Sequence, residues 1–338
     1  MNLLFFDLRE SEKNFFKENK FCDFNITFKE EALTEKTKLT DEEYEKTGIL
    51  CVYRSSILTA KVLKKFKNLR IIATRSHGFT HIDLDYCIKN RINVLNTEQY
   101  GEEAVAEFAI GVIIDLTRKI KNSMIDIRKK HISPKDYEGE LLNKKTIGII
   151  GCGKVGLKLA KIANFFEMKV LVSSYKESPQ FEKVCNIVPF DTLLANSDII
   201  YLHMPFTTEN YQIIGEEELN KMKDGVYIVN TSSVELIDLK ALYKSLASGK
   251  VKGAGLDILE SDYIKGKGST RANELGGETM CTKENYKITE KLLDMPNVLI
   301  TPHLAYNTKE YIDFVLEYTF NNIRDNIKGN YTNRICWE

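Results

Sequence analysis

The chain has 338 residues, and its 48 basic and 48 acidic side chains give a formal net charge of zero. This length corresponds to about two domains, and an apolar fraction of 43% supports a buried core and excludes a largely disordered chain. A neutral sum argues against nucleic acid as a main partner, because phosphate binding needs a basic excess.

The first part of the chain alternates short apolar runs with charged, amphipathic segments. This alternation predicts an α/β layer with a mostly parallel sheet. The expected strands are Leu3–Leu8, Phe24–Phe28, Gly48–Tyr53, Arg70–Ser76 and Asn93–Asn96. The expected helices between them are Arg9–Lys20, Thr59–Lys67 and Asp83–Asn90.

A long helix is expected next, from Glu102 to about Ile120, because apolar residues recur there at the helical period. The polar segment Lys121–Gly139 predicts a connection, Ser261–Asp294 predicts a loop with a short helix, and Thr308–Asn326 predicts a final helix. A second α/β alternation lies between these segments. Its expected strands are Thr146–Ile150, Val170–Ser173, Ile199–Leu202, Val226–Asn230, Gly253–Ile258 and Val298–Thr301.

Membrane and secretory features are not expected. No apolar run reaches the length of a spanning helix, and the first residues lack the basic region of a signal peptide. The 7 cysteines are scattered, odd in number and without a CxxC pair. We therefore expect reduced thiols and a cytoplasmic protein.

A glycine-rich turn joins the strand Thr146–Ile150 to an amphipathic segment in the order typical of dinucleotide binding. The first glycine of GxGxxG permits the tight turn, the second admits the pyrophosphate, and the third lets the helix pack closely. A glycine-rich turn without a ligand is the alternative interpretation. The cofactor residues expected here are Gly151, Gly153, Lys154, Val155 and Gly156.

The ribose-binding position lacks the acidic residue that normally ends the next strand. Ser174 and Lys176 follow Val170–Ser173, with no Asp or Glu among them. Because a 2′-phosphate is then not repelled, and both side chains can bind it, we favour NADP(H) over NAD(H). The alternative is that Lys176 is only a solvated loop charge.

Several motifs together resemble the D-isomer-specific 2-hydroxyacid dehydrogenase family, especially its D-lactate dehydrogenase branch. The resemblance covers nearly the whole chain. It is carried by Phe6–Glu12, Arg75–Leu84, Tyr100-Gly101 with Val105–Glu107, Leu202–Thr207 with Asn210, Met222–Gly225, Gly255–Asp257 and Pro296–Ala305.

The resemblance implies two Rossmann-like parallel-sheet domains, one flavodoxin-like and one that binds NAD(P). The substrate domain would comprise residues 1–98 and 303–338, and the dinucleotide domain residues 99–302, with the active site in the cleft. A homodimer built around the helix Glu102–Ile120 is also implied. Further cofactor residues would be Met204, Pro205, Thr231 and Asp257, although Asp257 is also open to a structural interpretation.

His303 matches the family's acid/base, since an imidazole can protonate a developing alkoxide near neutral pH. The family pairs this histidine with a carboxylate, and Asp262 stands at that position, one methylene shorter than the usual Glu. Glu260 is a possible substitute. A packed or surface histidine is the alternative for His303.

The family's catalytic arginine is missing. Ser233 stands where that arginine is expected, and Val234 replaces the neighbouring glycine. A guanidinium binds a carboxylate through two hydrogen bonds, whereas a serine hydroxyl carries no charge. Losing one such donor costs on the order of 10²–10³ in rate, so ordinary D-lactate dehydrogenase activity is doubtful.

Other residues are candidates for substrate binding. Arg54 follows a strand and is a possible second cation, while His77 is either functional or a surface loop residue. Gly78 makes a metal-binding pair of His77 and His81 improbable, so no metal site is expected. The expected substrate residues are Arg54, Ser76, His77, Gly78 and Tyr100.

Two hypotheses of different class follow. The first is an NAD(P)(H)-dependent oxidoreductase that acts on a 2-keto or 2-hydroxy acid, or a related carbonyl, with altered substrate recognition. The second is a catalytically silent nucleotide-binding sensor or interaction protein derived from the same family. The retained His303 and glycine loop favour the enzyme, and Ser233 favours the sensor.

Overall fold

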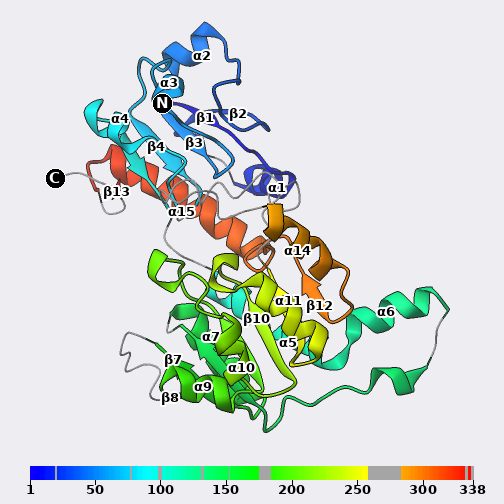
Figure 1. Ribbon diagram of the computed structural model, residues 1–338. Coiled ribbons are helices and arrows are strands. Elements are labelled where there is room, and N and C mark those ends of the chain that lie inside the picture. Colours follow the sequence, from blue (N-terminus) through cyan, green and yellow to red (C-terminus); the bar gives the residue numbers. More distant parts are fainter. Residues whose placement is uncertain are drawn as a thin grey trace. The chain divides into compact units, whose positions relative to one another are not determined.

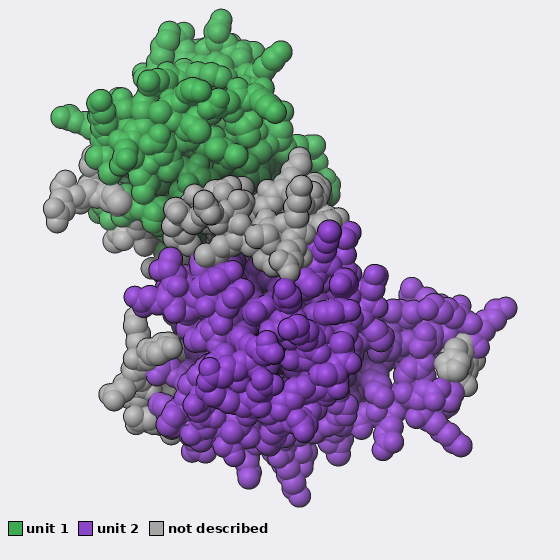
Figure 2. Space-filling model, in the orientation of Figure 1, with its two compact units in different colours: residues 1–100, 308–338 green, residues 101–307 purple. Residues whose placement is uncertain are grey.

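The computed structural model describes residues 1–19, 21–76, 78–97, 101–130, 133–151, 153–174, 184–257, 283–331 and 334–335. The chain forms two compact units, which Figure 2 colours separately. Unit 1 contains residues 1–100 and 308–338, and unit 2 contains residues 101–307. His303 therefore lies in unit 2, whereas the sequence-based boundary placed it at the start of the substrate domain.

Unit 1 is built on a sheet with the strand order β13-β5-β4-β3-β1-β2 (Figure 1). Its parallel strands are β1 (Asn2–Phe5), β2 (Asn25–Phe28), β3 (Ile49–Val52), β4 (Ile71–Thr74) and β5 (Asn93–Leu95). The short β13 (Arg334–Ile335) runs antiparallel to β5. The helices are α1 (Glu10–Glu18), α2 (Asp41–Lys46), α3 (Ala60–Leu63), α4 (Leu84–Lys89) and α15 (Lys309–Ile327).

Successive residues of these strands enter two different cores, because side chains alternate across a sheet. Leu50 joins the cluster that also holds Leu63 of α3, while Cys51 joins the cluster that holds Phe320 of α15. Both faces of the sheet are thus covered. This explains why β3 and β4 are buried throughout and appear in the sequence as continuous apolar runs.

An internal ion pair fixes the end of β4 in unit 1. Arg75 is 1% exposed, and its Nε lies 3.1 Å from Oε1 of Glu12 on α1. The same guanidinium donates to the carbonyl oxygens of Phe6 and Asp7, each at 3.0 Å. Because the guanidinium of Arg75 is buried and paired inside unit 1, this residue is structural.

Unit 2 contains a parallel sheet with the order β12-β11-β10-β9-β6-β7-β8 (Figure 1). Its strands are β6 (Thr146–Ile150), β7 (Lys169–Ser173), β8 (Asn186–Ile187), β9 (Ile199–Leu202), β10 (Val226–Asn230), β11 (Val251–Leu256) and β12 (Val298–Ile300). One face packs on α5 (Glu102–Arg118) and α7 (Lys154–Phe165). The other packs on α9 (Phe190–Asn196), α10 (Glu216–Lys221), α11 (Leu239–Ser248) and α14 (Lys283–Leu293).

The predicted α/β fold with two parallel sheets is confirmed, and every expected strand overlaps a strand of the structure. The first strand ends earlier than expected, at Phe5, because Asp7 adopts a left-handed φ of 56°. In the segment expected to be a loop with a short helix, α14 supplies the helix, and residues 258–282 lie outside the described residues.

The prediction of a plain connection at Lys121–Gly139 is wrong. This segment contains most of α6 (Ile120–Arg128) and a short 3₁₀-helix, Pro134–Tyr137. The polar composition of α6 gave no sign of a helix with a buried apolar face, because the few apolar residues of α6 are exposed. Within the part of the chain that the structure describes, no helix has the length and apolar character needed to cross a membrane.

Candidate active site

The carboxyl edge of the unit 2 sheet collects most of the residues expected to bind the cofactor. All strands of this sheet run parallel, so the residues that follow them meet at one edge. In open α/β sheets, ligands bind outside this edge. The residues directly after β6, β7, β9, β10 and β11 are Gly151, Ser174, His203, Thr231 and Asp257.

The glycine turn after β6 has no room for a side chain at its first glycine. Gly151 has a φ of +118°, and a Cβ added there would collide with the carbonyl oxygen of His203. A Cβ at Gly156 would lie 2.7 Å from the carbonyl oxygen of Gly151, so the third glycine lets α7 approach the turn. By contrast, a Cβ at Gly153 would meet nothing within 4 Å.

The amino end of α7 fits a dinucleotide phosphate. Gly153 is the N-cap of this helix, no side chain caps it, and no acidic residue lies in its first turn. The first N–H groups of a helix lack intrahelical acceptors and attract anions. The open space beside Gly153 and these donors together suit a pyrophosphate group.

Thr231 is held by one side chain of the neighbouring strand β9, Tyr201, and by His203 directly after that strand. Its Oγ1 lies 2.7 Å from the hydroxyl of Tyr201 and 3.1 Å from Nδ1 of His203. The two rings are parallel, with centroids 5.9 Å apart. Burial lowers the pKa of His203 to about 4, so its imidazole is neutral near pH 7.

Asp257 fixes the loop that carries His303. The Oδ1 atom of Asp257 accepts hydrogen bonds from Thr301 Oγ1 at 2.6 Å and from the Leu304 amide at 2.7 Å. Its Oδ2 accepts from the Ala305 amide at 2.7 Å. His303 has a left-handed φ of 55° and packs edge-on against Tyr306. The acid/base candidate is thereby joined to the carboxyl edge.

Ser233 lies in a turn that is held by a different residue. Ser233 is 5% exposed, and its carbonyl oxygen accepts a 2.7 Å hydrogen bond from Nδ2 of Asn230. The Oδ1 atom of Asn230 accepts from the amide of Ser232 at 2.9 Å. The turn after β10 thus depends on the side chain of Asn230 and on the backbone of residue 233.

In unit 1, the expected cation Arg54 follows β3 at the carboxyl edge of that sheet. Its guanidinium lies 5.5 Å from the ring centre of Tyr53, and the guanidinium of Arg9 lies 4.0 Å from the same ring. Asp7 organises this corner, because its carboxylate accepts from the amide of Tyr53 at 3.2 Å and from the hydroxyls of Ser55 and Ser56.

Ser76 and Gly78 lie at the same edge of unit 1, after β4. The hydroxyl of Ser76 donates to the carbonyl oxygen of Gly78 at 2.6 Å, and Thr74 Oγ1 lies 2.8 Å from Ser76 and 3.1 Å from Nε2 of His81. Burial, and secondarily the positive charge of Arg54, lowers the pKa of His81 to about 4. In the described residues, no group of His, Cys, Asp and Glu is arranged to hold a metal.

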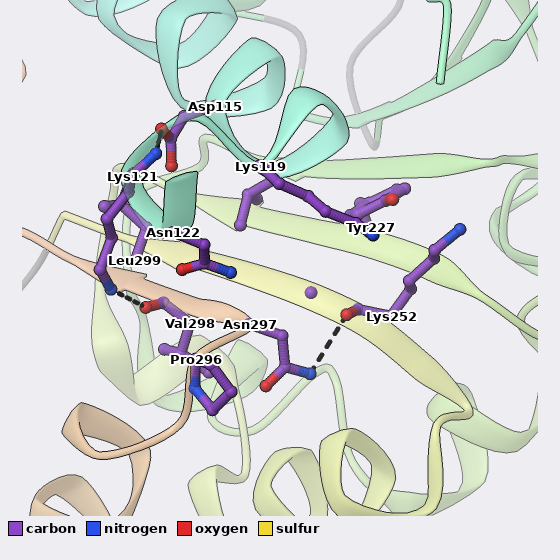
Figure 3. A pocket seen from close by; sticks show the side chains of 12 residues that line it. Asp115, Lys119, Lys121, Asn122, Tyr227, Lys252, Pro296, Asn297, Val298 and Leu299 are labelled. Atoms are coloured by element: carbon purple, nitrogen blue, oxygen red, sulfur yellow. Dashed lines mark hydrogen bonds between the residues drawn. The ribbon is translucent and has the colours of Figure 1, made fainter. Parts of the chain in front are cut away.

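A pocket in unit 2 lies at the opposite, amino-terminal edge of the sheet (Figure 3). None of the expected site residues lines it. Its lysines bind separate partners: Lys121 Nζ donates to the carbonyl oxygen of Val298 at 2.7 Å, and Lys252 pairs with Glu140. Because these ammonium groups do not converge, the pocket offers no chemistry comparable to the carboxyl edge.

Comparison with known proteins decides the family. A model described as the D-isomer specific 2-hydroxyacid dehydrogenase NAD binding domain matches residues 110–305. An aromatic 2-oxoacid reductase of Clostridium sporogenes is 34% identical over 82% of this chain and 82% of its own length. The D-lactate dehydrogenase of Escherichia coli K12 is 30% identical over 97% and 98% of the two chains. The chain belongs to the D-isomer specific 2-hydroxyacid dehydrogenase family.

The fold agrees with this family. A solved D-lactate dehydrogenase of Aquifex aeolicus, complexed with NAD and lactic acid, has a TM-score of 0.76 and 31% identity, and the match covers 100% of both chains. The predicted family is confirmed, and with it the oxidoreductase class of its members. The matched NAD binding domain also supports a nicotinamide cofactor.

Most of the expected site residues lie at the carboxyl side of the unit 2 sheet. These are the glycine turn, Met204, Pro205, Thr231, Ser233, Asp257 and His303. Arg54, Ser76 and Gly78 lie at the corresponding edge of unit 1. Four expected residues and one alternative lie outside the described residues. These are Lys176, Asp262, His77 and Tyr100, with Glu260 as the alternative.

Three residues around the candidate site were missed by the sequence reasoning. Tyr201 and His203 contact Thr231, and Asp7 arranges the corner beside Arg54. His203 belongs to the motif Leu202–Thr207, so the resemblance contained a signal for it. No signal pointed to Tyr201, because a tyrosine inside an apolar strand looks like an ordinary core residue.

We expect the stability of both units to fall on acidification, because His81 and His203 are neutral when folded. Their folded pKa values, about 4, lie below the ordinary 6.5, so the unfolded chain binds more protons between these values. The unfolding free energy should therefore decrease as the pH falls from about 7 to about 5. Urea denaturation at both pH values measures this decrease.

The variants His203→Asn and His81→Asn provide the control. Each removes one titrating group, so each should lose less stability than the wild type across the same pH interval. Equal losses in the wild type and both variants would contradict the neutral state of these histidines.

Proposed function

We propose that the chain is an NAD(P)H-dependent oxidoreductase that reduces a 2-oxo acid or a related carbonyl compound, with substrate recognition altered at Ser233. The observation that supports this best is the set of three hydrogen bonds that Asp257 accepts from residues 301, 304 and 305. These hydrogen bonds bring His303 to the same sheet edge as the glycine turn. A proton donor and a dinucleotide-binding turn on one edge are what carbonyl reduction requires.

The chain's own groups supply binding and proton transfer. The amino end of α7 binds the pyrophosphate, and Thr231 contacts the dinucleotide beside Asp257. A bound nicotinamide supplies the hydride that adds to the carbonyl carbon. His303 donates a proton from its imidazole to the carbonyl oxygen, and Asp262 is proposed to orient this imidazole. The product is the corresponding hydroxy compound.

Substrate recognition is proposed to depend on unit 1. The exposed Arg54 offers a guanidinium to an anionic group, with Ser76, Gly78, His77 and Tyr100 as further contacts. The corner formed by Asp7 and Tyr53 supports this proposal, since it anchors the backbone on which Arg54 stands. The substrate need not be a simple 2-oxo acid, because Ser233 cannot pair ionically with its carboxylate.

The setting is proposed to be the cytoplasm. Among the described residues, Cys22, Cys51 and Cys87 form no disulfide, and Cys51 and Cys87 are buried. Burial raises the pKa of Cys51 to about 11 and that of Cys87 to about 12. Such thiols are unreactive core residues, in agreement with a reducing compartment.

A homodimer is proposed through the α5–α6 region. The helix α6 projects from the rest of unit 2 (Figure 1), and Ile120, Met124, Ile125 and Ile127 on it are 39–56% exposed. Contiguous exposed apolar side chains mark association surfaces, and a second copy is the commonest partner of a soluble chain.

Ile127→Glu tests the homodimer. We expect the dissociation constant of the dimer, measured by sedimentation, to rise by at least about tenfold, because a buried charge replaces an apolar contact. Ile187→Glu on β8 is the matched control, since Ile187 is 42% exposed at the opposite edge of the sheet. A wild type that sediments as a monomer, or equal effects of both substitutions, would refute this surface.

Gly153→Ala tests the cofactor site. Its methyl group enters open space, so we expect unchanged thermal stability but dinucleotide affinity reduced by about tenfold or more, because the methyl blocks the approach of the pyrophosphate. Fluorescence titrations with NADH and with NADPH measure the affinity. The absence of a carboxylate at Ser174 predicts tighter binding of NADPH.

Gly151→Ala serves as the structural control, because it should destabilise the protein through its φ of +118° and its collision with His203. Unchanged dinucleotide affinity of a folded Gly153→Ala variant would contradict the cofactor site. Tighter binding of NADH than of NADPH by the wild type would overturn the proposed cofactor preference.

Ser233→Arg, alone and with Val234→Gly, tests the altered chemistry. We expect kcat/KM for 2-oxo acid reduction to rise by on the order of 10², because a guanidinium pairs with the substrate carboxylate. Ser232→Arg in the same turn is the matched control and should give no increase. No increase in stable, dinucleotide-binding Ser233 variants would contradict the role of this position. If the wild type binds NADPH but reduces none of a broad panel of carbonyl compounds, the alternative of a catalytically silent nucleotide-binding sensor is favoured.

A further inference from the structure

Burial and hydrogen bonding of Tyr201, Thr231 and His203 favour one arrangement of their protons. Tyr201 is fully buried, and among the described residues its hydroxyl pairs with Thr231. A buried phenol proton without an acceptor is costly, so Tyr201 donates to Thr231 Oγ1. Among the described residues, the Thr231 hydroxyl has no hydrogen-bond partner besides Tyr201 and His203, so its single proton is assigned to Nδ1 of His203, which is 3.1 Å away.

This arrangement determines the tautomer of His203. The imidazole is neutral near pH 7, and its Nδ1 accepts the proton of Thr231. The ring proton of His203 therefore resides on Nε2. The parallel stacking of Tyr201 on His203 holds both rings in the orientation that these hydrogen bonds need.

The same arrangement leaves Thr231 with one hydrogen-bonding capability toward a ligand. A threonine hydroxyl has one proton and two lone pairs. The proton is directed to His203, and one lone pair accepts from Tyr201. The remaining lone pair can only accept a hydrogen bond.

We propose that Tyr201 and His203 are positioning residues that hold the hydroxyl of Thr231 as a hydrogen-bond acceptor toward the dinucleotide. The inference rests on the proposed function, since it assumes that a dinucleotide binds at this edge. It adds a role for the fully buried Tyr201 and for His203, and it specifies the ligand group that Thr231 recognises as an N–H or O–H donor.

The backbone of His203 makes this positioning relevant to the whole cofactor site. Its carbonyl oxygen occupies the space that a side chain at Gly151 would need, and its amide donates to the carbonyl oxygen of Ile150 at 3.1 Å. A shift of the His203 backbone would therefore disturb both the glycine turn and the imidazole that contacts Thr231. Tyr201 and Thr231 hold His203 against such a shift.

A double-mutant cycle tests whether Tyr201 acts through Thr231. We expect Thr231→Val to raise the dissociation constant of the tighter-binding reduced dinucleotide, NADPH or NADH, by about fivefold, and Thr231→Ser to retain wild-type affinity. Tyr201→Phe should weaken binding by about threefold in the wild type and by nothing further in the Thr231→Val background. Equal effects of Tyr201→Phe in the two backgrounds would overturn the proposal.

Tyr227→Phe is the matched control for this cycle. Tyr227 is also buried in this sheet, but its hydroxyl donates to Glu140 at 2.9 Å, far along β10 at the amino-terminal edge. The substitution should leave dinucleotide affinity unchanged. A loss of affinity as large as that of Tyr201→Phe would show a general effect of removing buried hydroxyls, and would overturn the positioning role.

The histidine tautomer provides a readout that needs no cofactor. Two-bond ¹H–¹⁵N correlation spectra distinguish the tautomers, and His203→Asn identifies the signal. We expect the Nε2–H form in the wild type and a shift toward the Nδ1–H form in Thr231→Val. The Nδ1–H form in the wild type would overturn the proposal. If neither NADH nor NADPH binds, the proposed function and this positioning role both fail. If a dinucleotide binds but the mutant cycle or the tautomer contradicts the expectation, only the positioning role is rejected.

Discussion

The interaction on which the site depends is the close contact between the glycine turn after β6 and the chain after β9. The carbonyl oxygen of His203 fills the volume beside Gly151, so the two strand ends touch through their backbones. A hydrogen bond continues from His203 to Thr231, which directly follows β10. The Asp257 amide then donates to the Asn230 carbonyl oxygen at 2.9 Å, which links β10 to β11. Four neighbouring strands are thereby joined at their carboxyl ends.

Asp257 extends these links between strand ends to the chain after β12, and so to His303. A non-glycine residue at a φ of 55° costs about 1 kcal/mol or more, and such strain persists only where the surroundings enforce it. Three hydrogen bonds to Asp257 provide that enforcement for the loop around His303. The aspartate is buried to 2% exposure, so its carboxylate is satisfied by this loop. The structural interpretation of Asp257 therefore explains how the acid/base candidate is held in place.

Local patterns carried much of this information, and long-range contacts carried the rest. Continuous apolar runs predict β3, β4, β9 and β10, because strands that are buried on both faces need no alternation. The glycine spacing predicts the turn after β6. The role of Tyr201 depends on the hydroxyl of Thr231, 30 positions away and directly after the next strand, β10, which only the strand register brings near. Likewise, α6 was missed because its apolar residues face outward, and periodicity arguments assume a core.

The turn after β10 explains how this scaffold can keep its fold without the expected arginine. Asn230 is fully buried, and it bonds to the carbonyl oxygen of residue 233 and to the amide of residue 232. Both contacts are made to backbone atoms, so neither depends on the side chain at position 233. A serine at this position therefore leaves the hydrogen bonds of the turn intact, and under the proposed function it removes a positive charge from the substrate site. The side chain at position 233 can therefore differ from arginine while the carboxyl edge from Gly151 to His303 stays assembled, which is the structural basis of the recognition change that we propose for Ser233.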